Sequence, residues 1–221
     1  TMTDASHFGG LVAGGAMNNP FDFGFDVVTT TTHKSLRGPR GGMVLCSKAL
    51  ASKVDKSVFP GLQGGPHMNA VAAIAVTLLK AQSEEFKGYA KQVLLNAKTL
   101  AKSLMDQQAT LITGGTDNHM MVVETTSSFG LDGRQAEEVL DKVNITTNKQ
   151  IIPDDPNPPL RPSGIRIGTP AATARGMAES DMQQLGEWIV TCLQNSEDEG
   201  LLHDTRESVK SFCGRFPVPG I

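Results

Sequence analysis

The sequence lacks a strong net charge, a long apolar run and a leader-like first segment. Its formal net charge of −3 over 221 residues gives no reason to expect nucleic acid or a membrane surface as a partner. No uninterrupted apolar stretch reaches the length of a membrane span, and the first residues do not show the basic-then-apolar pattern of a signal peptide. We therefore expect a cytoplasmic protein that acts without nucleic acid or membrane.

Cysteine is also scarce, and its placement shows no metal-binding pattern. The chain has three cysteines, Cys46, Cys192 and Cys213, which are widely spaced. Zinc sites usually show closely spaced cysteine or histidine pairs, and neither residue type has such a spacing here. The sequence therefore predicts reduced thiols, as in a cytosol-like compartment, and no metal site.

What the sequence does contain is typical of a globular protein. Hydrophobic residues make up 39% and charged residues 19% of the chain, and its length suits one large domain or two modest ones. The first residues, Thr1–Asp4, match the end of a strand whose beginning is absent. Because a native protein rarely opens at the end of a core strand, we expect the chain to be a fragment or one half of a longer protein.

The first half of the chain alternates β-rich runs with glycine-rich loops. Asp26–Thr32 is almost entirely β-branched and predicts a strand, as does Met43–Cys46, whereas Phe8–Ala16 predicts a short helix or turn. Apolar residues then recur at helical spacing over residues 71–104. This pattern is too long for one ordinary helix, so we expect a bend or break near Gly88. A long helix of this kind often joins two domains.

The pattern changes after about Ala109, where short strands and helices interleave without a regular alternation. Such an order is typical of a smaller α+β domain with a largely antiparallel sheet. We therefore expect two domains, at residues 1–92 and 93–221. The predicted strands are Thr110–Thr113, His119–Thr126, Val143–Thr147 and Gly164–Gly168, and the predicted helices are Arg134–Lys142, Asp181–Gln194 and Thr205–Phe212.

Residues that could take part in catalysis follow the strand predicted at residues 26–32. Lys34 follows that strand directly and precedes a glycine-rich loop, which is where ligands bind in open α/β sheets. Cationic neighbours such as His33 and Arg40 favour an amine that is reactive enough to form a Schiff base. An ordinary surface lysine at a strand end would show the same local pattern, so this position alone does not decide its role.

Asp4 ends an earlier predicted strand, thirty residues before Lys34. That separation suits one strand–helix–strand crossover, which would place the two side chains next to each other in a parallel sheet. A carboxylate beside a pyridine nitrogen keeps the nitrogen protonated and makes the ring an electron sink. His7 is close enough in sequence to hold Asp4 or to touch such a ring. Taken alone, the structural role is favoured for both: a turn or cap residue for Asp4 and a hydrogen-bonded structural histidine for His7.

Six segments resemble signature stretches of the serine hydroxymethyltransferase family, in the family's order and with similar spacing. The resemblance covers essentially the whole chain, but only the later half of the family's usual length. It implies an α/β fold of the pyridoxal-phosphate-dependent aminotransferase-like kind (fold type I), with the end of the large parallel-sheet domain followed by a smaller α+β C-terminal domain. The segments are DASH, VVTTTTHKSLRGPRGGM, FPGLQGGPHMNAVA, GGTDNHMMVV, NITTNKQ and SGIRIGTPAATARG.

The resemblance implies a transferase of one-carbon and amino-acid metabolism, glycine hydroxymethyltransferase. Such an enzyme moves a one-carbon unit reversibly from L-serine to tetrahydrofolate, giving glycine and methylenetetrahydrofolate, with pyridoxal 5'-phosphate as cofactor. The family forms homodimers or tetramers with shared active sites. Part of the site lies upstream of the matched segment, so the chain alone is expected to be inactive and to expose apolar surface meant for an N-terminal half.

The same resemblance assigns roles residue by residue. Lys34 matches the lysine that forms the internal aldimine with pyridoxal phosphate, and Asp4 matches the aspartate on its pyridinium nitrogen. Arg166 matches the arginine that binds the substrate α-carboxylate, a group that a planar guanidinium suits. Gln150 stands where many members have an asparagine near the folate ring. The further matches are Thr31 and His33 beside the lysine, His7 near the ring hydroxyl, Arg40 in the active-site loop, and Gly64 and Gly65, whose amides reach the phosphate in the neighbouring subunit.

The sequence departs from the family pattern at two positions, and two other identities for the chain remain possible. Ala5 replaces a larger apolar residue, and Gln150 keeps an amide on a longer side chain. The chain could instead belong to a threonine aldolase-like pyridoxal-phosphate enzyme, or be a non-catalytic subunit that complements an N-terminal half. The segments NKQ and GGTDNH favour the folate enzyme, and the intact Lys34, Asp4 and Arg166 argue against a chain that has lost catalysis.

Overall fold

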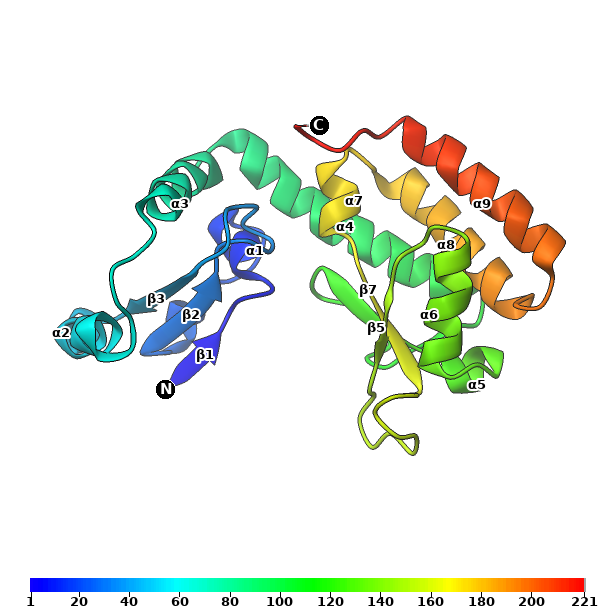
Figure 1. The fold of residues 1–221 in the computed structure, drawn as a ribbon, viewed down its shortest axis with the longest axis horizontal. Helices are drawn as coiled ribbons and strands as arrows, with labels where there is room; N and C mark the ends of the chain where they lie inside the picture. Colours follow the sequence, from blue (N-terminus) through cyan, green and yellow to red (C-terminus); the bar gives the residue numbers. More distant parts are fainter. Residues whose placement is uncertain (221) are drawn as a thin grey trace. The chain divides into compact units, whose positions relative to one another are not determined.

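The computed structural model describes residues 1–220, which form two compact units (Figure 1). The first unit is Thr1–Lys91, and the second begins at Gln92, inside one long helix. Both units combine strands with helices, so the chain is an α/β protein, as the sequence predicts. That these units are the two predicted domains, with a boundary at residues 92–93, stays a prediction.

The first unit contains a three-stranded mixed sheet in the order β1-β2-β3. β1 runs parallel to β2, and β2 pairs antiparallel with β3. The chain passes from β1 to β2 through helical segments, so the predicted strand–helix–strand crossover is confirmed, and Asp4 lies opposite Thr29. The elements are β1 (Met2–Asp4), α1 (Gly9–Ala13), η1 (Pro20–Phe23), β2 (Val27–Thr31) and β3 (Gly42–Cys46).

The helices that follow this sheet bury few residues. α2 and η2 bury none, and α3 buries only Ala81. α2 is not predicted from the sequence, because Leu50 and Val54 are its only large apolar residues and form no long helical stripe. These elements are α2 (Lys48–Lys56), η2 (Ser57–Leu62), α3 (Met68–Ala81) and α4 (Glu84–Asp106), which continues into the second unit.

The predicted break in the long helical pattern is present, but it lies at Gln82 and Ser83 and not at Gly88. α3 ends at Ala81 and α4 begins at Glu84, which leaves Gly88 inside α4. The Ser83 hydroxyl accepts a hydrogen bond from the Phe86 N–H at 3.2 Å and so caps the first turn of α4. A glycine in a helix costs only about 1 kcal/mol, and α4 has buried residues on both sides of this one.

The second unit contains a four-stranded sheet in the order β4-β5-β7-β6, and all of its pairs are antiparallel. The largely antiparallel sheet is therefore confirmed. The predicted strand Val143–Thr147 is wrong, because Asn144 has a left-handed φ of 61° and the strand begins only at Asn148. Val143 and Ile145 are buried in the core instead. The strands are β4 (Thr110–Leu111), β5 (Met120–Glu124), β6 (Asn148–Gln150) and β7 (Gly164–Gly168).

Helices pack against one face of this sheet and enclose the apolar core of the second unit. Leu100 of α4, Leu140 of α6 and Ile189 of α8 are fully buried there together with Ile165 of β7. The short helices α5 and α7 are not predicted from the sequence, since neither is long enough to show helical periodicity. The helices are α5 (Thr125–Phe129), α6 (Gly133–Lys142), α7 (Pro170–Ala174), α8 (Glu179–Gln194) and α9 (Glu199–Gly214).

α9 begins six residues earlier than the predicted helix Thr205–Phe212. Asp198 caps its first turn, because the carboxylate accepts a hydrogen bond from the Leu201 N–H at 3.0 Å. At the other end, Arg175 donates to the Phe216 carbonyl at 2.7 Å and to a carbonyl in the last turn of α9 at 3.1 Å. Among residues 1–220, no helix is both long enough and apolar enough to cross a membrane.

Candidate functional site

Asp4 lies at the end of β1, where three donors hold its carboxylate. The Thr29 hydroxyl donates at 2.6 Å, and the hydroxyl and N–H of Ser6 each donate at 3.0 Å. These hydrogen bonds, led by the one from Thr29, hold the pKa of Asp4 below its ordinary value, and the positive charge of Lys34 lowers it further. The end of β1 therefore presents an ionised carboxylate in the field of a nearby amine.

Lys34 lies in a tight loop between β2 and β3 whose backbone is fixed by Thr32. The Thr32 N–H donates to the Gly41 carbonyl at 3.0 Å, and its hydroxyl donates to the Pro39 carbonyl at 2.6 Å. The Thr32 carbonyl accepts a hydrogen bond from the Gly38 N–H at 2.8 Å. Lys34 itself is exposed. The loop thus holds the backbone firmly and leaves the amine accessible.

α1 packs against this loop so closely that two of its positions accept only glycine. The Gly10 N–H donates to the Ser35 hydroxyl at 3.0 Å, and a Cβ on Gly10 would lie 2.3 Å from the Ser35 carbonyl oxygen. A Cβ on Gly9 would lie 2.4 Å from the Thr30 hydroxyl oxygen. The glycine pair therefore lets α1 touch both the strand and the loop that carry Lys34.

The other predicted residues near Lys34 lie in the same loop or in the turn after β1. The Thr31 hydroxyl donates to the Ser6 carbonyl at 3.1 Å and ties β2 to that turn. His33 has a buried Nδ1 without a hydrogen-bond partner among residues 1–220. His7 is half-buried in the turn, and Arg40 is exposed just before β3. The first unit therefore gathers Asp4 with these side chains around one edge of its sheet.

Gly64 and Gly65 lie in an exposed segment between η2 and α3. A Cβ added to either glycine would meet no atom within 4 Å, so the space around both is open. Open backbone of this kind can offer its N–H groups to an anion. The predicted role of the pair toward a phosphate in a neighbouring subunit stays a prediction.

Arg166 and Gln150 lie on one face of the sheet of the second unit. Arg166 is opposite Asn148 in the β6–β7 ladder, and its Nε donates to the Asn148 side-chain oxygen at 3.2 Å. Because side chains alternate between faces along a strand, Gln150 shares this face, while Ile165 and Ile167 point into the core. A guanidinium with two neighbouring amides suits a carboxylate and other hydrogen-bonding ligands.

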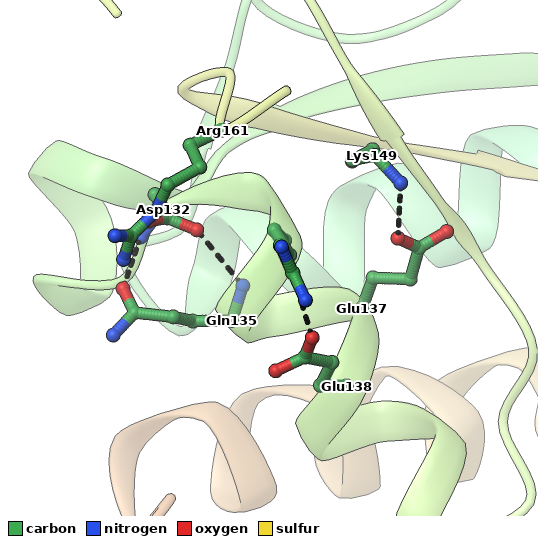
Figure 2. A network of polar contacts seen from close by, with 7 residues as sticks. Asp132, Gln135, Glu137, Glu138, Lys149 and Arg161 are labelled. Carbon is green, nitrogen blue, oxygen red and sulfur yellow. Dashed lines mark hydrogen bonds and ion pairs between the residues drawn. The ribbon is translucent and has the colours of Figure 1, made fainter. Parts of the chain in front are cut away.

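The opposite face of the same strands is held by α6. Lys149 points to this helix and its Nζ lies 3.0 Å from Glu137 Oε2 (Figure 2). α6 begins with a capping box between Asp132 and Gln135, and the Asp132 carboxylate also accepts from Arg161 Nε at 2.7 Å (Figure 2). These contacts connect α6 to β6 and to the segment before β7, and so brace the two strands that carry the candidate substrate residues.

Two residues that hold the candidate site are not predicted from the sequence. Thr29 is the hydroxyl nearest to Asp4, and Ser35 anchors α1 to the Lys34 loop. Because side chains alternate along β2, Thr29 and Thr31 lie on the same face, and this pattern could have predicted that one of them meets Asp4. Only the register of β1 against β2 shows that Thr29, and not Thr31, meets the carboxylate.

The candidate residues fall into two groups, one in each unit. Asp4 and Lys34 belong to the first unit, and Gln150 and Arg166 belong to the second. Each group is assembled by the strand pairing of its own sheet. In the part of the chain described, no group of three or more histidine, cysteine, aspartate or glutamate side chains is placed to hold a metal ion.

The chain is an α/β protein with an amine and a carboxylate at the end of one sheet and an arginine on the face of the other, groups whose chemistry suits small polar ligands. A family model described as serine hydroxymethyltransferase matches residues 1–189. The chain therefore belongs to the serine hydroxymethyltransferase family, and the resemblance drawn from the six sequence segments is confirmed.

A curated relative agrees with this family. The serine hydroxymethyltransferase of Koribacter versatilis (strain Ellin345) is 49% identical to this chain over 217 residues. The alignment covers 98% of this chain and 50% of the relative. The chain thus spans about half the length of the relative that it matches.

Proposed function

We propose that this chain provides the cofactor lysine and the substrate arginine of a pyridoxal-phosphate-dependent serine hydroxymethyltransferase. The reaction is the reversible transfer of a one-carbon unit from L-serine to tetrahydrofolate, which gives glycine and methylenetetrahydrofolate. The observation that carries the proposal is the parallel pairing of β1 with β2, which places Asp4 at the end of β1 and the exposed Lys34 just after the end of β2. The charge of Lys34 also contributes to the lowered pKa of Asp4. Family membership and the similarity to a serine hydroxymethyltransferase support the proposal.

The side chains of the first unit fit pyridoxal phosphate chemically. Lys34 offers an amine to the aldehyde of the cofactor, and Asp4 offers an ionised carboxylate to its pyridine nitrogen. When bound there, the cofactor supplies an electron sink for the bond that breaks at the substrate Cα. Within the described residues 1–220 the buried Nδ1 of His33 has no hydrogen-bond partner, and a polar ligand would provide one.

In this proposal Asp4 keeps a proton on the pyridine nitrogen. Its three donors fix the orientation of the carboxylate and favour its charged form. Thr31 and His33 would act as catalytic neighbours of Lys34, and His7 would contact the ring hydroxyl of the bound cofactor. Arg40 would contribute positive charge near the cofactor, and the open backbone at residues 64–65 would offer N–H groups to the cofactor phosphate of a neighbouring subunit.

The second unit provides the substrate contacts. Asn148 engages Arg166 through Nε, and among residues 1–220 the terminal nitrogens of Arg166 are left to bind the α-carboxylate of L-serine or glycine. Gln150 uses Nε2 to hold the Ile151 carbonyl at 3.0 Å, so its side-chain oxygen stays available as an acceptor. We propose that this oxygen accepts a hydrogen bond from tetrahydrofolate.

The family also supports a proposal for architecture and assembly. We propose fold type I, with residues 1–92 as the end of the large cofactor-binding domain and residues 93–221 as the small domain. We further propose a cytoplasmic homodimer or tetramer in which Gly64 and Gly65 serve the active site of a neighbouring subunit. Such sharing accounts for two glycines whose surroundings are open.

A hybrid enzyme tests the proposal most completely. This chain would replace the matching half of the Koribacter versatilis enzyme, and serine cleavage would be measured with and without tetrahydrofolate. We expect folate-dependent cleavage that falls by about a thousand-fold or more in Lys34→Arg. Lys48→Arg, which changes an exposed lysine of α2, is the matched control and should keep the parent rate.

Two results would overturn the proposal. A Lys34→Arg hybrid with the parent rate would show that this lysine is not the cofactor lysine. Cleavage of serine that proceeds equally well without folate would favour the threonine aldolase-like alternative.

A further inference from the structure

One carboxylate organises the loop of residues 151–163, which joins β6 to β7. Asp155 Oδ2 accepts hydrogen bonds from the Ile152 N–H at 3.1 Å and the Ser163 N–H at 2.9 Å. Asp155 Oδ1 accepts from the Asn157 N–H at 3.0 Å and the Ser163 hydroxyl at 2.7 Å. Burial raises the pKa of Asp155, but these hydrogen bonds outweigh it and bring the pKa far below the ordinary value.

The far end of this loop is anchored a second time. Ser163 is only 1% exposed, and its carbonyl accepts hydrogen bonds from the N–H of Thr125 at 2.8 Å and from the Thr125 hydroxyl at 3.1 Å. The Asn157 side chain also donates to the Ser163 hydroxyl at 3.0 Å. Ser163 is therefore a fixed point, and Asp155 ties the rest of the loop to it.

Asp155 joins the two ends of the loop, and each end is next to one of the candidate substrate residues. Ile152 is two residues after Gln150, and Ser163 is three residues before Arg166. Gly164, which follows Ser163, pairs with Gln150 in the β6–β7 ladder, and a Cβ on Gly164 would lie 2.9 Å from an Ile152 side-chain carbon. β6 has only three residues, so the loop contributes a large share of what holds it in register.

We infer that Asp155 is a positioning residue for the substrate site: it fixes the register of β6 against β7 and so holds Gln150 and Arg166 on one face at a set separation. This inference rests on the proposed function of those two side chains. Among residues 1–220, the hydrogen-bond partners of the Asp155 carboxylate all lie in this loop, so Asp155 is not a catalytic residue. Its role needs a carboxylate, because both oxygens accept two hydrogen bonds and an amide would turn a donor toward backbone N–H groups.

The chain provides a matched control beside Asp155. Asp154 is exposed and adopts a left-handed φ of 53°, a conformation that asparagine tolerates. Asp154→Asn therefore removes the same charge at the neighbouring position without removing an acceptor from Ser163. Ser163→Ala is a milder second variant, because it deletes the hydroxyl and keeps the N–H bond to Asp155.

Two measurements test the inference. Hydrogen exchange of the 221-residue chain reports on the backbone, and the KM for L-serine and for tetrahydrofolate in the hybrid enzyme reports on the site. In Asp155→Asn we expect exchange at residues 148–152 and 163–168 to accelerate about ten-fold or more, with α8 unchanged. Both KM values should rise about ten-fold or more while kcat changes less than about three-fold. Ser163→Ala should show the same pattern with a smaller amplitude.

The outcomes separate the inference from the function on which it rests. Exchange and KM values equal to those of Asp154→Asn would overturn the inference. Faster exchange with unchanged KM values would also overturn it, since Asp155 would then serve stability alone. If Asp155→Asn does not fold, Ser163→Ala decides by the same criteria. A parent hybrid without activity, together with faster exchange in Asp155→Asn, would instead contradict the proposed function and leave the structural role of Asp155 in place.

Discussion

The Thr29 hydroxyl donates the shortest of the three hydrogen bonds to Asp4, at 2.6 Å. In Thr29→Val this donor is lost at nearly constant volume, so we expect the pKa of Asp4 to rise toward its ordinary value. Because the pKa of Asp4 is lowered in the folded chain, its contribution to stability is present above a pH of about 4 and is lost as the pH falls. NMR titration of the Asp4 carboxyl carbon measures the change.

Thr31 provides the control for this substitution. Its hydroxyl donates to the Ser6 carbonyl and not to Asp4. Thr31→Val should therefore leave the titration of Asp4 almost unchanged. Equal shifts in both variants would contradict the assignment of Thr29 as the main donor.

Asn96 stabilises the second unit, because its side chain is fully buried and both its amide nitrogen and its amide oxygen make hydrogen bonds. Nδ2 donates to the Thr173 hydroxyl at 2.9 Å and the Met177 carbonyl at 2.8 Å, and Oδ1 accepts from Gln92 at 2.9 Å. Asn96→Leu removes these three hydrogen bonds and takes away the donor of the Met177 carbonyl, so we expect the free energy of unfolding to fall by about 2 kcal/mol. Urea denaturation measures it. Lys98→Ala, an exposed change on the same helix, should stay within about 0.5 kcal/mol, and equal losses in both variants would contradict this account.

At the scale of elements, the start of α6 combines a cap with an ion pair. The Asp132 carboxylate accepts from the Gln135 N–H at 2.9 Å and from Arg161 Nε at 2.7 Å (Figure 2). We expect Asp132→Ala to lower the free energy of unfolding by about 1 kcal/mol, as the loss of an N-cap does. Arg161→Ala, which removes the ion pair and keeps the cap, should cost less, and the opposite order would contradict the capping account.

The same group gives α6 a pH dependence. Burial raises the pKa of Asp132, but the hydrogen bonds from Gln135 and Arg161 bring it below the ordinary value. Its stabilisation is therefore complete above a pH of about 4 and is lost as the pH falls through the lowered pKa. In Asp132→Ala this part of the acid sensitivity should be absent.

The helices and strands also show which elements a sequence pattern predicts correctly and which it does not. The β-branched run of β2 and the apolar alternation of β7 predict strands correctly, because each has a periodicity of its own. Val143 and Ile145 look like a strand but are buried beside a left-handed turn at Asn144. The short helix α7 is tied to α4 by hydrogen bonds from the Thr169 hydroxyl to the Val93 carbonyl and from Asn96 to the Thr173 hydroxyl, and such contacts leave no periodic pattern in the sequence.

The sequence predicts those residues of the candidate site that lie at or just after the end of a predicted strand. Asp4 ends one predicted strand and Lys34 follows another, so the crossover between the strands brings both residues to the same end of the sheet. The supporting residues were not predictable. Asp155 acts through donors up to eight residues away in a loop without regular structure, and Thr29 acts through strand register.

At the scale of the whole chain, burial differs between the two units. The apolar core cluster lies in the second unit, whereas α2, η2 and α3 of the first bury almost nothing. Leu62, Met68 and Leu79 are 86%, 67% and 69% exposed, so the first unit carries large apolar side chains on its surface. That this surface is meant for an N-terminal half stays a prediction. We expect amide hydrogens of α3 to exchange much faster than those of α8 in the 221-residue chain. Equal protection of the two helices would contradict this picture.

The central claim is that Lys34 is the lysine that holds pyridoxal phosphate, and one measurement tests it most directly. The 221-residue chain is mixed with pyridoxal phosphate, reduced with borohydride, digested and mapped by mass spectrometry, with Lys34→Ala in parallel. The account predicts a reduced cofactor adduct concentrated on Lys34, well above that on the exposed Lys48, and an absorbance band that the variant lacks. An adduct spread evenly over surface lysines, with the same spectrum in Lys34→Ala, would contradict it.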